Sequence, residues 1–223
     1  MVALPAVDIR RAVRRGLEED LAQGDITTTV LFSEPAPARA RIIAQQPLVV
    51  AGMAAAIQTF IAVDASLKLI PSRRDGSHAK NGDVLLRIEG DGRSILMAER
   101  VALNFLQHLS GIATLTSRFC HAVHGYPVKI MDTRKTLPGW RALQKWAVSL
   151  GGGTNHRMSL GDGILIKDNH LALMKNMKSA VLTACRIAQA MASKDKPVIV
   201  EVESLSEVHD AVMARPTSFS WTI

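Results

Sequence analysis

The sequence predicts an α/β protein made of two parts, because two different patterns follow one another along the chain. From about residue 38 to residue 97, short β-type runs such as ARIIAQQPLVVAG and DVLLRIEG are separated by Gly, Asn and Pro. After Gly125 and Pro127, strands and helices alternate instead. Repeated βα units indicate a parallel sheet, either a barrel or an open doubly wound sheet, and periodicity does not choose between these two.

Two amphipathic helices belong to the first part. Ile9, Val13, Leu17 and Leu21 recur every four residues, and Asp8 is the expected N-cap of the helix that carries them. A second, long helix is expected to start near Ala98. Its apolar face follows a 3.6-residue period and consists of Val101, Phe105, Leu109, Ile112 and Phe119.

The second part alternates between β-type and helical runs. The expected strands are VKIMDT, GILIKDN and VIVEVE. The expected helices are WRALQKWAVSL, residues 171–192, and SLSEVHDAVMA, which opens with a capping box of Ser204 and Glu207. This order puts the polar motifs at the C-terminal ends of strands, where such folds keep their functional sites.

The composition is ordinary for a folded protein, with 48% hydrophobic and 21% charged residues among 223. The apolar stretches are far shorter than the roughly 20 residues that a membrane helix needs. The N-terminal positive charge follows a short apolar run, the reverse of a secretory signal. Two cysteines imply neither a disulfide framework nor a cysteine-ligated metal cluster. We therefore expect a cytoplasmic protein that does not act at a membrane.

The formal net charge of +7 raises the question of a nucleic-acid partner. Against that partner, the chain has only one Tyr, five Phe and three Trp, and no run of Lys or Arg longer than two. The basic residues are spread out or stand singly within glycine-rich motifs. A pocket for a small polyanionic substrate explains the charge better than nucleic acid does.

Three cationic motifs follow successive predicted strands or the helix between them. The motif DTRKT carries Arg134 and Lys135, which offer a fixed fork of donors and a mobile point charge. An isolated Arg-Lys pair is more often a solvated loop, but this one is followed by GGGTNHR and KDNH. These add His156, Arg157 and Lys167. Three glycines in a row allow backbone amides to approach an anion closely, so the three motifs together predict one anion site.

Two acidic residues, Glu201 and Glu203, alternate onto one face of the predicted strand VIVEVE. Two acids facing a barrel interior need cations or a metal as partners. Carboxylate oxygens suit Mg²⁺, which keeps several waters and bridges phosphates. The alternative is an edge strand with both carboxylates in solvent.

These motifs, in this order, resemble the quinolinate phosphoribosyltransferase family, also called nicotinate-nucleotide pyrophosphorylase (carboxylating). The segments that carry the resemblance span nearly the whole chain: EEDLAQGDITT (18–28), AERVALNFLQHLSGIAT (98–114), DTRKTLPGWRALQKWAV (132–148), GGGTNHRMSLGDGILIKDNH (151–170) and VEVESL (200–205).

The resemblance implies an N-terminal α/β sandwich domain over residues 1–115 and an incomplete α/β barrel over residues 116–223. It also implies a homodimer in which the sandwich of one subunit caps the barrel of the other.

The reaction implied by the resemblance is transfer of a phosphoribosyl group from phosphoribosyl pyrophosphate to quinolinate with loss of CO₂, a step of NAD biosynthesis. The residues implied to line the quinolinate pocket are Arg134, His156, Arg157 and Lys167, with Arg100 from the neighbouring subunit. Lys135 is implied to be catalytic and to contact both substrates. Glu201 is implied to be catalytic as well, on the ribose or Mg²⁺ side of phosphoribosyl pyrophosphate.

The match to the family stops abruptly after residue 217. The family continues with a strand ending in Leu-Leu-Asp-Asn, whereas this chain reads SFSWTI. A one-base shift turns the codons of Trp221 and Thr222 into a codon for Asp, and permitted codons for residues 218–223 then allow Ile-Ile-Leu-Leu-Asp-Asn. On the sequence we infer a frameshift close to codon 217. We expect a C-terminally truncated chain that lacks the later barrel strands, exposes an unpaired strand edge, aggregates and is inactive or nearly so.

Three rival readings stay open on the sequence. One is a paralogue of the same fold that acts on a different ring acid or serves molybdenum metabolism. Another is a non-catalytic remnant that at most dimerises with an intact copy. A basic nucleic-acid module is the third, and it requires salt-dependent binding to DNA.

Overall fold

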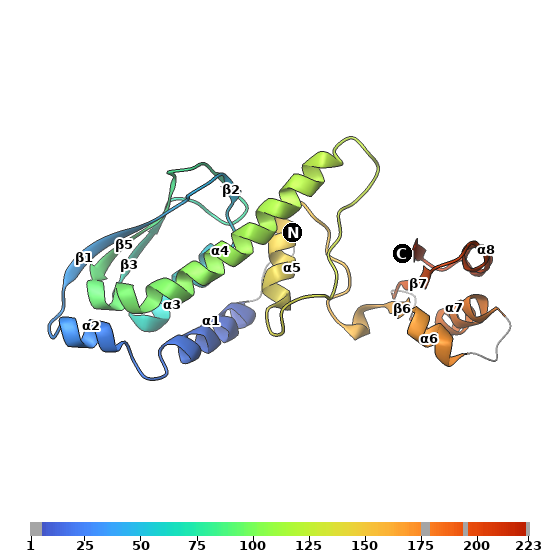
Figure 1. The fold of residues 1–223 in the computed structure, drawn as a ribbon, viewed down its shortest axis with the longest axis horizontal. Coiled ribbons are helices and arrows are strands. Elements are labelled where there is room, and N and C mark those ends of the chain that lie inside the picture. The colour runs from blue at the N-terminus through green and yellow to red at the C-terminus, as the bar shows by residue number, and fades with distance from the viewer. Residues whose placement is uncertain (1–5, 175–178, 194–195, 222–223) are drawn as a thin grey trace. The chain divides into compact units, whose positions relative to one another are not determined.

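The computed structural model describes residues 6–174, 179–193 and 196–221. It confirms the α/β class, and the chain forms two compact units, Met1–His156 and Arg157–Ile223, which we call the N-terminal and C-terminal units. The elements are labelled along the chain in Figure 1. The predicted domain division at residue 115 stays a prediction. Helix α4 (Gly92–Ala122) runs through that point.

The N-terminal unit is a layer of helices on an antiparallel sheet. Its helices are α1 (Ala6–Asp20), α2 (Ile26–Leu31), α3 (Met53–Val63), α4 and α5 (Arg141–Leu150). Its strands are β1 (Pro37–Ile43), β2 (Leu48–Val49), β3 (Lys68–Pro71), β4 (His78–Ala79) and β5 (Val84–Asp91). The main sheet has the order β1-β5-β3, and β2 pairs separately with β4.

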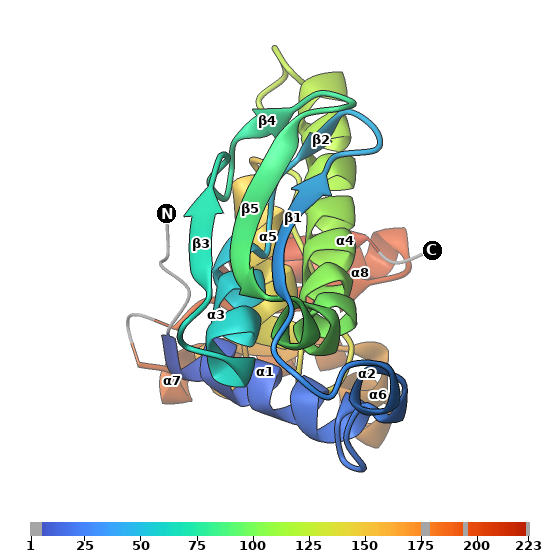
Figure 2. The same cartoon turned by 90° about the vertical axis from the view of Figure 1, so that its left-hand side faces the viewer.

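Helices α3 and α4 cover one face of this sheet, as Figure 2 shows from the side of the strands. The layers meet in a core of buried apolar side chains, among them Phe60 from α3, Leu86 and Ile88 from β5, and Leu106 from α4. The alternation of buried and outward residues along β5 puts Leu86 and Ile88 on this inner face.

The other side of α4 is covered by α1 and α5. Val13, Phe105, Leu109 and Leu143 join these three helices in a second buried cluster. This confirms the apolar faces expected for the two N-terminal helices except at Phe119, which is exposed. The helix expected to start near Ala98 begins at Gly92, because the Asp91 side chain caps it by accepting a hydrogen bond from the Arg93 amide. Asp8, expected as an N-cap, lies inside the first turn of α1.

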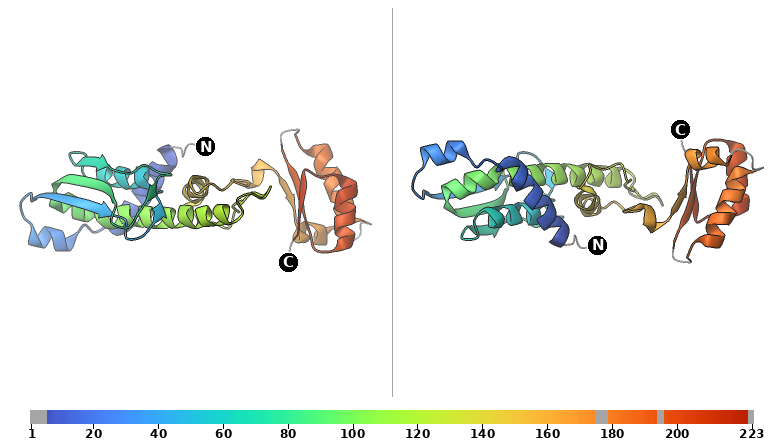
Figure 3. Two further views of the ribbon diagram at one scale, coloured as in Figure 1. Left: turned by 90° about the horizontal axis from the view of Figure 1, so that it is seen from above. Right: turned by 90° about the horizontal axis from the view of Figure 1, so that it is seen from below.

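The C-terminal unit is a parallel sheet with sequential strand order β6-β7-β8. Its elements are a 3₁₀ turn (Leu160–Asp162), β6 (Ile164–Ile166), α6 (Asp168–Leu173), α7 (Ala180–Met191), β7 (Val198–Val202), α8 (Leu205–Ala214) and β8 (Ser218–Trp221). Helices α7 and α8 lie side by side on one face of the sheet (Figure 3). Sequential strands with their crossover helices on one face are typical of a barrel segment rather than of a doubly wound sheet.

Three sequence expectations for the second part need correction. The predicted strand VKIMDT makes only one isolated bridge, between Met131 and Thr154. The helix expected over residues 171–192 corresponds to the two helices α6 and α7, and residues 175–178 of that range lie outside the described residues. Ser204 caps α8 as expected, but the Glu207 carboxylate accepts from the amide of Glu203 rather than of Ser204.

Among the described residues, no helix combines the length and the apolar character that crossing a bilayer requires.

Candidate functional site

In the N-terminal unit, the predicted motif DTRKT and residues 151–156 of GGGTNHR are joined through their backbones. The Thr154 amide donates to the carbonyl of Ile130 at 2.8 Å, and the Asp132 amide donates to the carbonyl of Thr154 at 3.2 Å. This short parallel pairing replaces the expected strand. It brings Arg134 and Lys135, which follow Asp132, to the same end of the pairing as His156.

The Asp132 carboxylate is the centre of a hydrogen-bond network between the two motifs. It accepts bonds from the Lys145 ammonium, from the His156 amide at 2.8 Å and from Asn155 Nδ2 at 2.6 Å. Lys145 Nζ also donates to the His156 carbonyl at 3.0 Å, and Asn155 Nδ2 donates to the carbonyl of Lys145 at 2.7 Å. Loop 151–157, loop 132–136 and helix α5 are thereby tied together.

Lys145 and Asp132 are almost fully buried, with 1% and 7% of their side chains exposed. A buried charge is costly unless it is paired and hydrogen-bonded, and each member of this pair satisfies the other. Sequence reasoning assigned neither residue a role. On a helical wheel Lys145 lies nearly opposite Leu143 and Ala147, so periodicity alone makes it look like a solvent-facing lysine.

Helix α5 also holds the DTRKT loop through its first turn. Arg141 donates from Nε to Thr136 Oγ1 at 3.0 Å and from its Nη2 to the carbonyl of Arg134 at 3.4 Å. The Arg134 side chain is half-buried. Within the part of the chain that the structure describes, its Nε is buried and has no hydrogen-bond partner. The loop backbone is thus fixed while the Arg134 side chain keeps an unused donor. Lys135 is exposed.

The start of α5 is anchored on α4 by aromatic and polar contacts. The rings of Trp140 and Phe105 stack with centroids 4.8 Å apart, and His108 meets the edge of Trp140 at 5.3 Å. Gln144 Nε2 lies 2.7 Å from His108 Nε2, and Gln144 Oε1 accepts from the Leu137 amide at 3.0 Å. These contacts pack the start of α5, and the DTRKT loop before it, against α4.

The three glycines of GGGTNHR serve the packing of the loop against α4. A Cβ at Gly151 would lie 2.3 Å from the carbonyl oxygen of Ala113, and one at Gly153 would lie 2.9 Å from Thr116 Cγ2. Gly152 has φ of +90°, which favours glycine. The amides of all three donate to carbonyls at the end of α5. Our interpretation that these amides approach an anion was therefore wrong, because the helix C-terminus uses them.

In the C-terminal unit, Lys167 and Glu201 meet at the carboxyl ends of neighbouring strands. Lys167 follows β6 directly and Glu201 lies near the end of β7, and the parallel register pairs Ile166 with Val200. Lys167 Nζ lies 3.2 Å from Glu201 Oε1, with 41% and 22% of the two side chains exposed. Arg157 donates from its Nη1 to the carbonyl of Gly163 at 2.9 Å. The Lys167–Glu201 ion pair is partly exposed and therefore accessible to a ligand.

Glu203 does not share this position with Glu201. Strand β7 ends at Val202, so Glu203 lies beyond it and is exposed, with its amide bonded to Glu207. The expected pair of acids on one strand face is therefore wrong. The described residues contain no group of three His, Cys, Asp or Glu side chains that could hold a metal ion.

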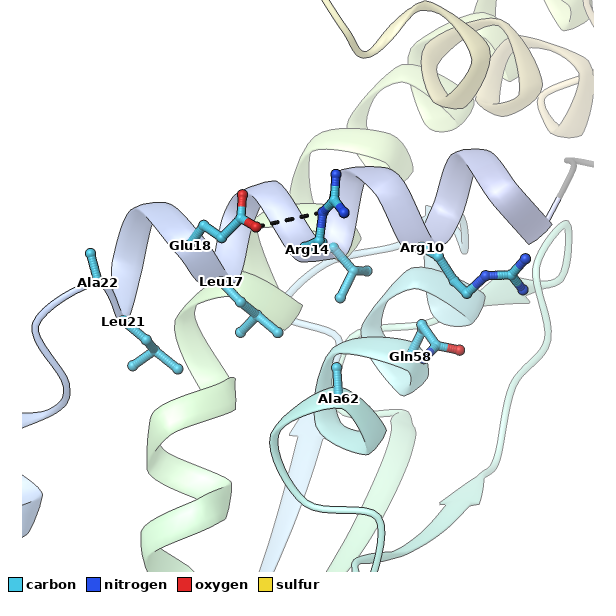
Figure 4. Close-up of a pocket in the computed structure, with 9 residues that line it drawn as sticks. Arg10, Arg14, Leu17, Glu18, Leu21, Ala22, Gln58 and Ala62 are labelled. Atoms are coloured by element: carbon cyan, nitrogen blue, oxygen red, sulfur yellow. Dashed lines mark ion pairs between the residues drawn. The ribbon is translucent and has the colours of Figure 1, made fainter.

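Arg100 lies on the exposed face of α4 in the N-terminal unit. A groove between α1 and α3 contains no predicted site residue (Figure 4). It is lined by Arg10, Arg14, Leu17, Glu18, Leu21 and Gln58, with Arg14 paired to Glu18 across an exposed helix face.

Comparison with known families divides the chain into two matched regions. The N-terminal domain of quinolinate phosphoribosyl transferase matches residues 25–110, and the C-terminal domain of that family matches residues 112–218.

Named relatives and solved structures show the same similarity. Nicotinate-nucleotide pyrophosphorylase (carboxylating) of Mycobacterium leprae is 42% identical over 209 residues, which are 92% of this chain and 71% of that protein. The chloroplastic enzyme of that name from Oryza sativa is 39% identical over 212 residues, but the matched part is only 56% of its length. The structure of NadC from Streptococcus pyogenes superposes with a TM-score of 0.85 at 38% identity, covering 96% of this chain and 74% of that one.

The chain thus spans between just over half and about three quarters of these proteins. Both domain matches and the retained motifs lead to one conclusion: the chain belongs to the quinolinate phosphoribosyltransferase family.

Proposed function

We propose that this chain carries the binding machinery for phosphoribosyl transfer to quinolinate with decarboxylation, which yields nicotinate mononucleotide, pyrophosphate and CO₂. The observation that carries the proposal is the pair of motifs DTRKT and GGGTNHR, which the Asp132 network brings together in a chain of this family. The half-buried Arg134, with a donor that no described residue satisfies, supports a carboxylate as the group bound there.

The roles of the individual residues follow from the match to the family motifs. We propose that the quinolinate-binding residues are Arg134, His156, Arg157 and Lys167, with Arg100 of a second subunit. Quinolinate carries two adjacent carboxylates, so several cationic donors around it serve affinity and orientation together. Lys135 is exposed, and we assign it contact with both substrates. Glu201 is assigned to the ribose side of phosphoribosyl pyrophosphate.

The chemistry requires the ring nitrogen of quinolinate to bond to the anomeric carbon while pyrophosphate leaves with the electron pair of its C–O bond. Holding the two reactants in line supplies much of the acceleration. Lys135 stabilises the charge that develops on the pyrophosphate oxygen. The 2-carboxylate then leaves as CO₂, because the adjacent pyridinium nitrogen stabilises the electron pair left on the ring carbon. A proton from solvent completes nicotinate mononucleotide.

Mg²⁺ fits this site as a partner of pyrophosphate. The described residues offer Glu201 as one carboxylate ligand, already paired with Lys167. Mg²⁺ commonly binds through one or two carboxylates together with waters and substrate phosphates, so one carboxylate suits an ion that arrives with the substrate. When bound, Mg²⁺ neutralises charge on the leaving pyrophosphate.

We also propose a homodimer in the cytoplasm with no nucleic-acid or membrane partner. Exposure of Arg100 on α4 supports its use by a second subunit. The scattered basic residues and the half-buried Arg134 support a small anion rather than nucleic acid as the ligand.

The test is quinolinate binding and turnover by the full chain and by variants. Arg134→Ala and Arg157→Ala should each weaken quinolinate binding by roughly 10- to 100-fold, because a hydrogen bond to a charged group contributes about 1.5–3 kcal/mol. Titration calorimetry measures the affinity. Mass spectrometry detects nicotinate mononucleotide in the presence of phosphoribosyl pyrophosphate and Mg²⁺.

The matched control is Arg186→Ala, which removes an exposed arginine from α7 and should leave binding unchanged. Nicotinate lacks the 2-carboxylate and should bind more weakly than quinolinate. Equal affinities of the wild type, Arg134→Ala and Arg157→Ala would contradict the assignment. A preference for another ring acid would favour a paralogue of the same fold.

A further inference from the structure

The backbone of His156 is held on both sides by two buried charged side chains. Its amide donates to Asp132 Oδ1 at 2.8 Å, and its carbonyl accepts from Lys145 Nζ at 3.0 Å. Because Asp132 and Lys145 also pair with each other, the peptide of His156 is bonded to both members of an ion pair. These bonds use only the backbone, so the imidazole takes no part in them.

The same carboxylate fixes the starting point of the other motif. Asp132 lies two residues before Arg134, and its own amide is bonded to Thr154 at 3.2 Å. A shift of Asp132 therefore moves the backbone that leads to Arg134, together with the backbone of Thr154 and His156. The two motifs cannot move independently while the carboxylate keeps its bonds.

We propose that Lys145 and Asp132 are positioning residues, which set the distance between Arg134 and His156 for quinolinate without touching it. The proposal rests on the proposed function, because it names the ligand that the two motifs share. Lys145 has only 1% of its side chain exposed, and Asp132 has 7%. Neither side chain is accessible to a substrate, so both act through the loops they hold.

The donor and acceptor pattern explains why a carboxylate and an ammonium are needed. Asp132 Oδ1 accepts from Lys145 and from the His156 amide, and Oδ2 accepts from Asn155. Asparagine has only one acceptor oxygen, so its NH₂ group would face one of these donors. Methionine in place of Lys145 would fill similar space but would leave the Asp132 charge and the His156 carbonyl without that donor.

The first readout needs no ligand. Amide hydrogen exchange should show the His156 amide protected in the wild type, because its acceptor is buried. Lys145→Met and Asp132→Asn should speed its exchange at least about 10-fold and leave amides in the β1–β5 pairing unchanged. Lys129→Met, at an exposed lysine close to the same loop, is the matched control and should change neither.

The second readout is quinolinate affinity, measured by calorimetry on the same variants. Each single variant should bind quinolinate roughly 10- to 100-fold more weakly, since small displacements of positioned groups have effects of this size. The double variant Asp132→Asn/Lys145→Met removes both charges. It should recover part of the thermal stability that either single variant loses, but it should not recover affinity.

Three results would overturn the proposal. One is a wild-type His156 amide that exchanges as fast as the same amide in an unfolded peptide, a measurement that does not depend on any variant folding. Another is a double variant with wild-type affinity, which would make the pair structural only. The third is unchanged exchange at His156 in both single variants. Failure of the proposed function looks different: the wild type does not bind quinolinate, while the exchange pattern is as described.

Discussion

Each unit of the molecule contains one lysine paired with a carboxylate next to a predicted site motif, and the two pairs differ in exposure. In the N-terminal unit, Lys145 and Asp132 have 1% and 7% of their side chains exposed and share further bonds with Asn155 and His156. In the C-terminal unit, Lys167 and Glu201 have 41% and 22% exposed.

The difference in exposure indicates different roles: the buried pair fixes the site loops, and the exposed pair can bind a ligand. A buried pair is fully satisfied by protein groups, so it can fix loops but cannot exchange its partners for a ligand. A half-exposed pair is weakened by water and can give up its partner to a carboxylate or phosphate at little cost. The sequence motifs singled out Lys167 and Glu201 separately, and the pair that these two residues form is the more exposed one.

Breaking the two pairs should therefore have very different effects on stability. Lys145→Met leaves Asp132 buried without its cation, and we expect a loss of about 3–5 kcal/mol in the free energy of unfolding. Lys167→Met should change it by about 1 kcal/mol or less, because that pair is half-exposed. Urea unfolding followed by tryptophan fluorescence and by circular dichroism measures both.

Equal losses for Lys145→Met and Lys167→Met would break this comparison, since exposure would then not decide the role of each pair. Lys129→Met gives the change in the free energy of unfolding expected for an exposed lysine.

The packing of residues 151–153 on α4 is expected to make the next largest contribution to the free energy of unfolding. Gly151→Ala places a Cβ 2.3 Å from the Ala113 carbonyl oxygen and should reduce the free energy of unfolding by about 1–3 kcal/mol. Gly111→Ala, within α4 at a position with open space around a Cβ, should stabilise the helix by up to about 1 kcal/mol. Both are measured by urea unfolding, and a neutral Gly151→Ala would show that the loop does not rest on the helix.

A third ion pair, Asp91 with Arg93, is intermediate in exposure. We expect its removal to have the smallest effect on stability, seen as a change in how stability depends on pH. The hydrogen bond from the Arg93 side chain, with those from the amides of Arg93 and Ala36, lowers the pKa of Asp91 from 3.8 to about 2. A lowered carboxyl pKa in the folded protein contributes stability that is present above pH 3.8 and is lost as the pH falls towards 2.

Asp91→Asn should therefore reduce the fall in unfolding midpoint between pH 5 and pH 2, relative to the wild type. Thermal unfolding at a series of pH values measures this slope. An unchanged slope would mean that the Asp91 carboxylate titrates alike in the folded and unfolded chain.

The fold was largely predictable, because its signals are local and periodic. The stripe of Val101, Phe105 and Leu109 predicted the long helix, and the βα alternation after residue 127 predicted the parallel sheet. The start of α4 was misplaced by six residues because Asp91 both ends β5 and caps α4, so no loop separates the strand from the helix. The reduction of VKIMDT to a single bridge depends on its pairing with Thr154, which no local pattern encodes.

The candidate site was predictable in its cationic motif residues and hidden in the buried lysine that holds them. Arg134, His156 and Lys167 stand in motifs whose composition marks them. Lys145 carries no such mark, since a lysine in an amphipathic helix is commonplace.

The sequence by itself determined the family, the α/β class and the identity of the cationic motifs, because these depend on residue types at fixed spacings. Only the tertiary structure decided that Asp132 and Lys145 are buried together, that the three glycines pack on α4, and that Glu201 and not Glu203 meets a cation. The physical reason is that burial and pairing depend on residues brought together from different elements. The role of a charged side chain depends on the groups that surround it in the folded chain.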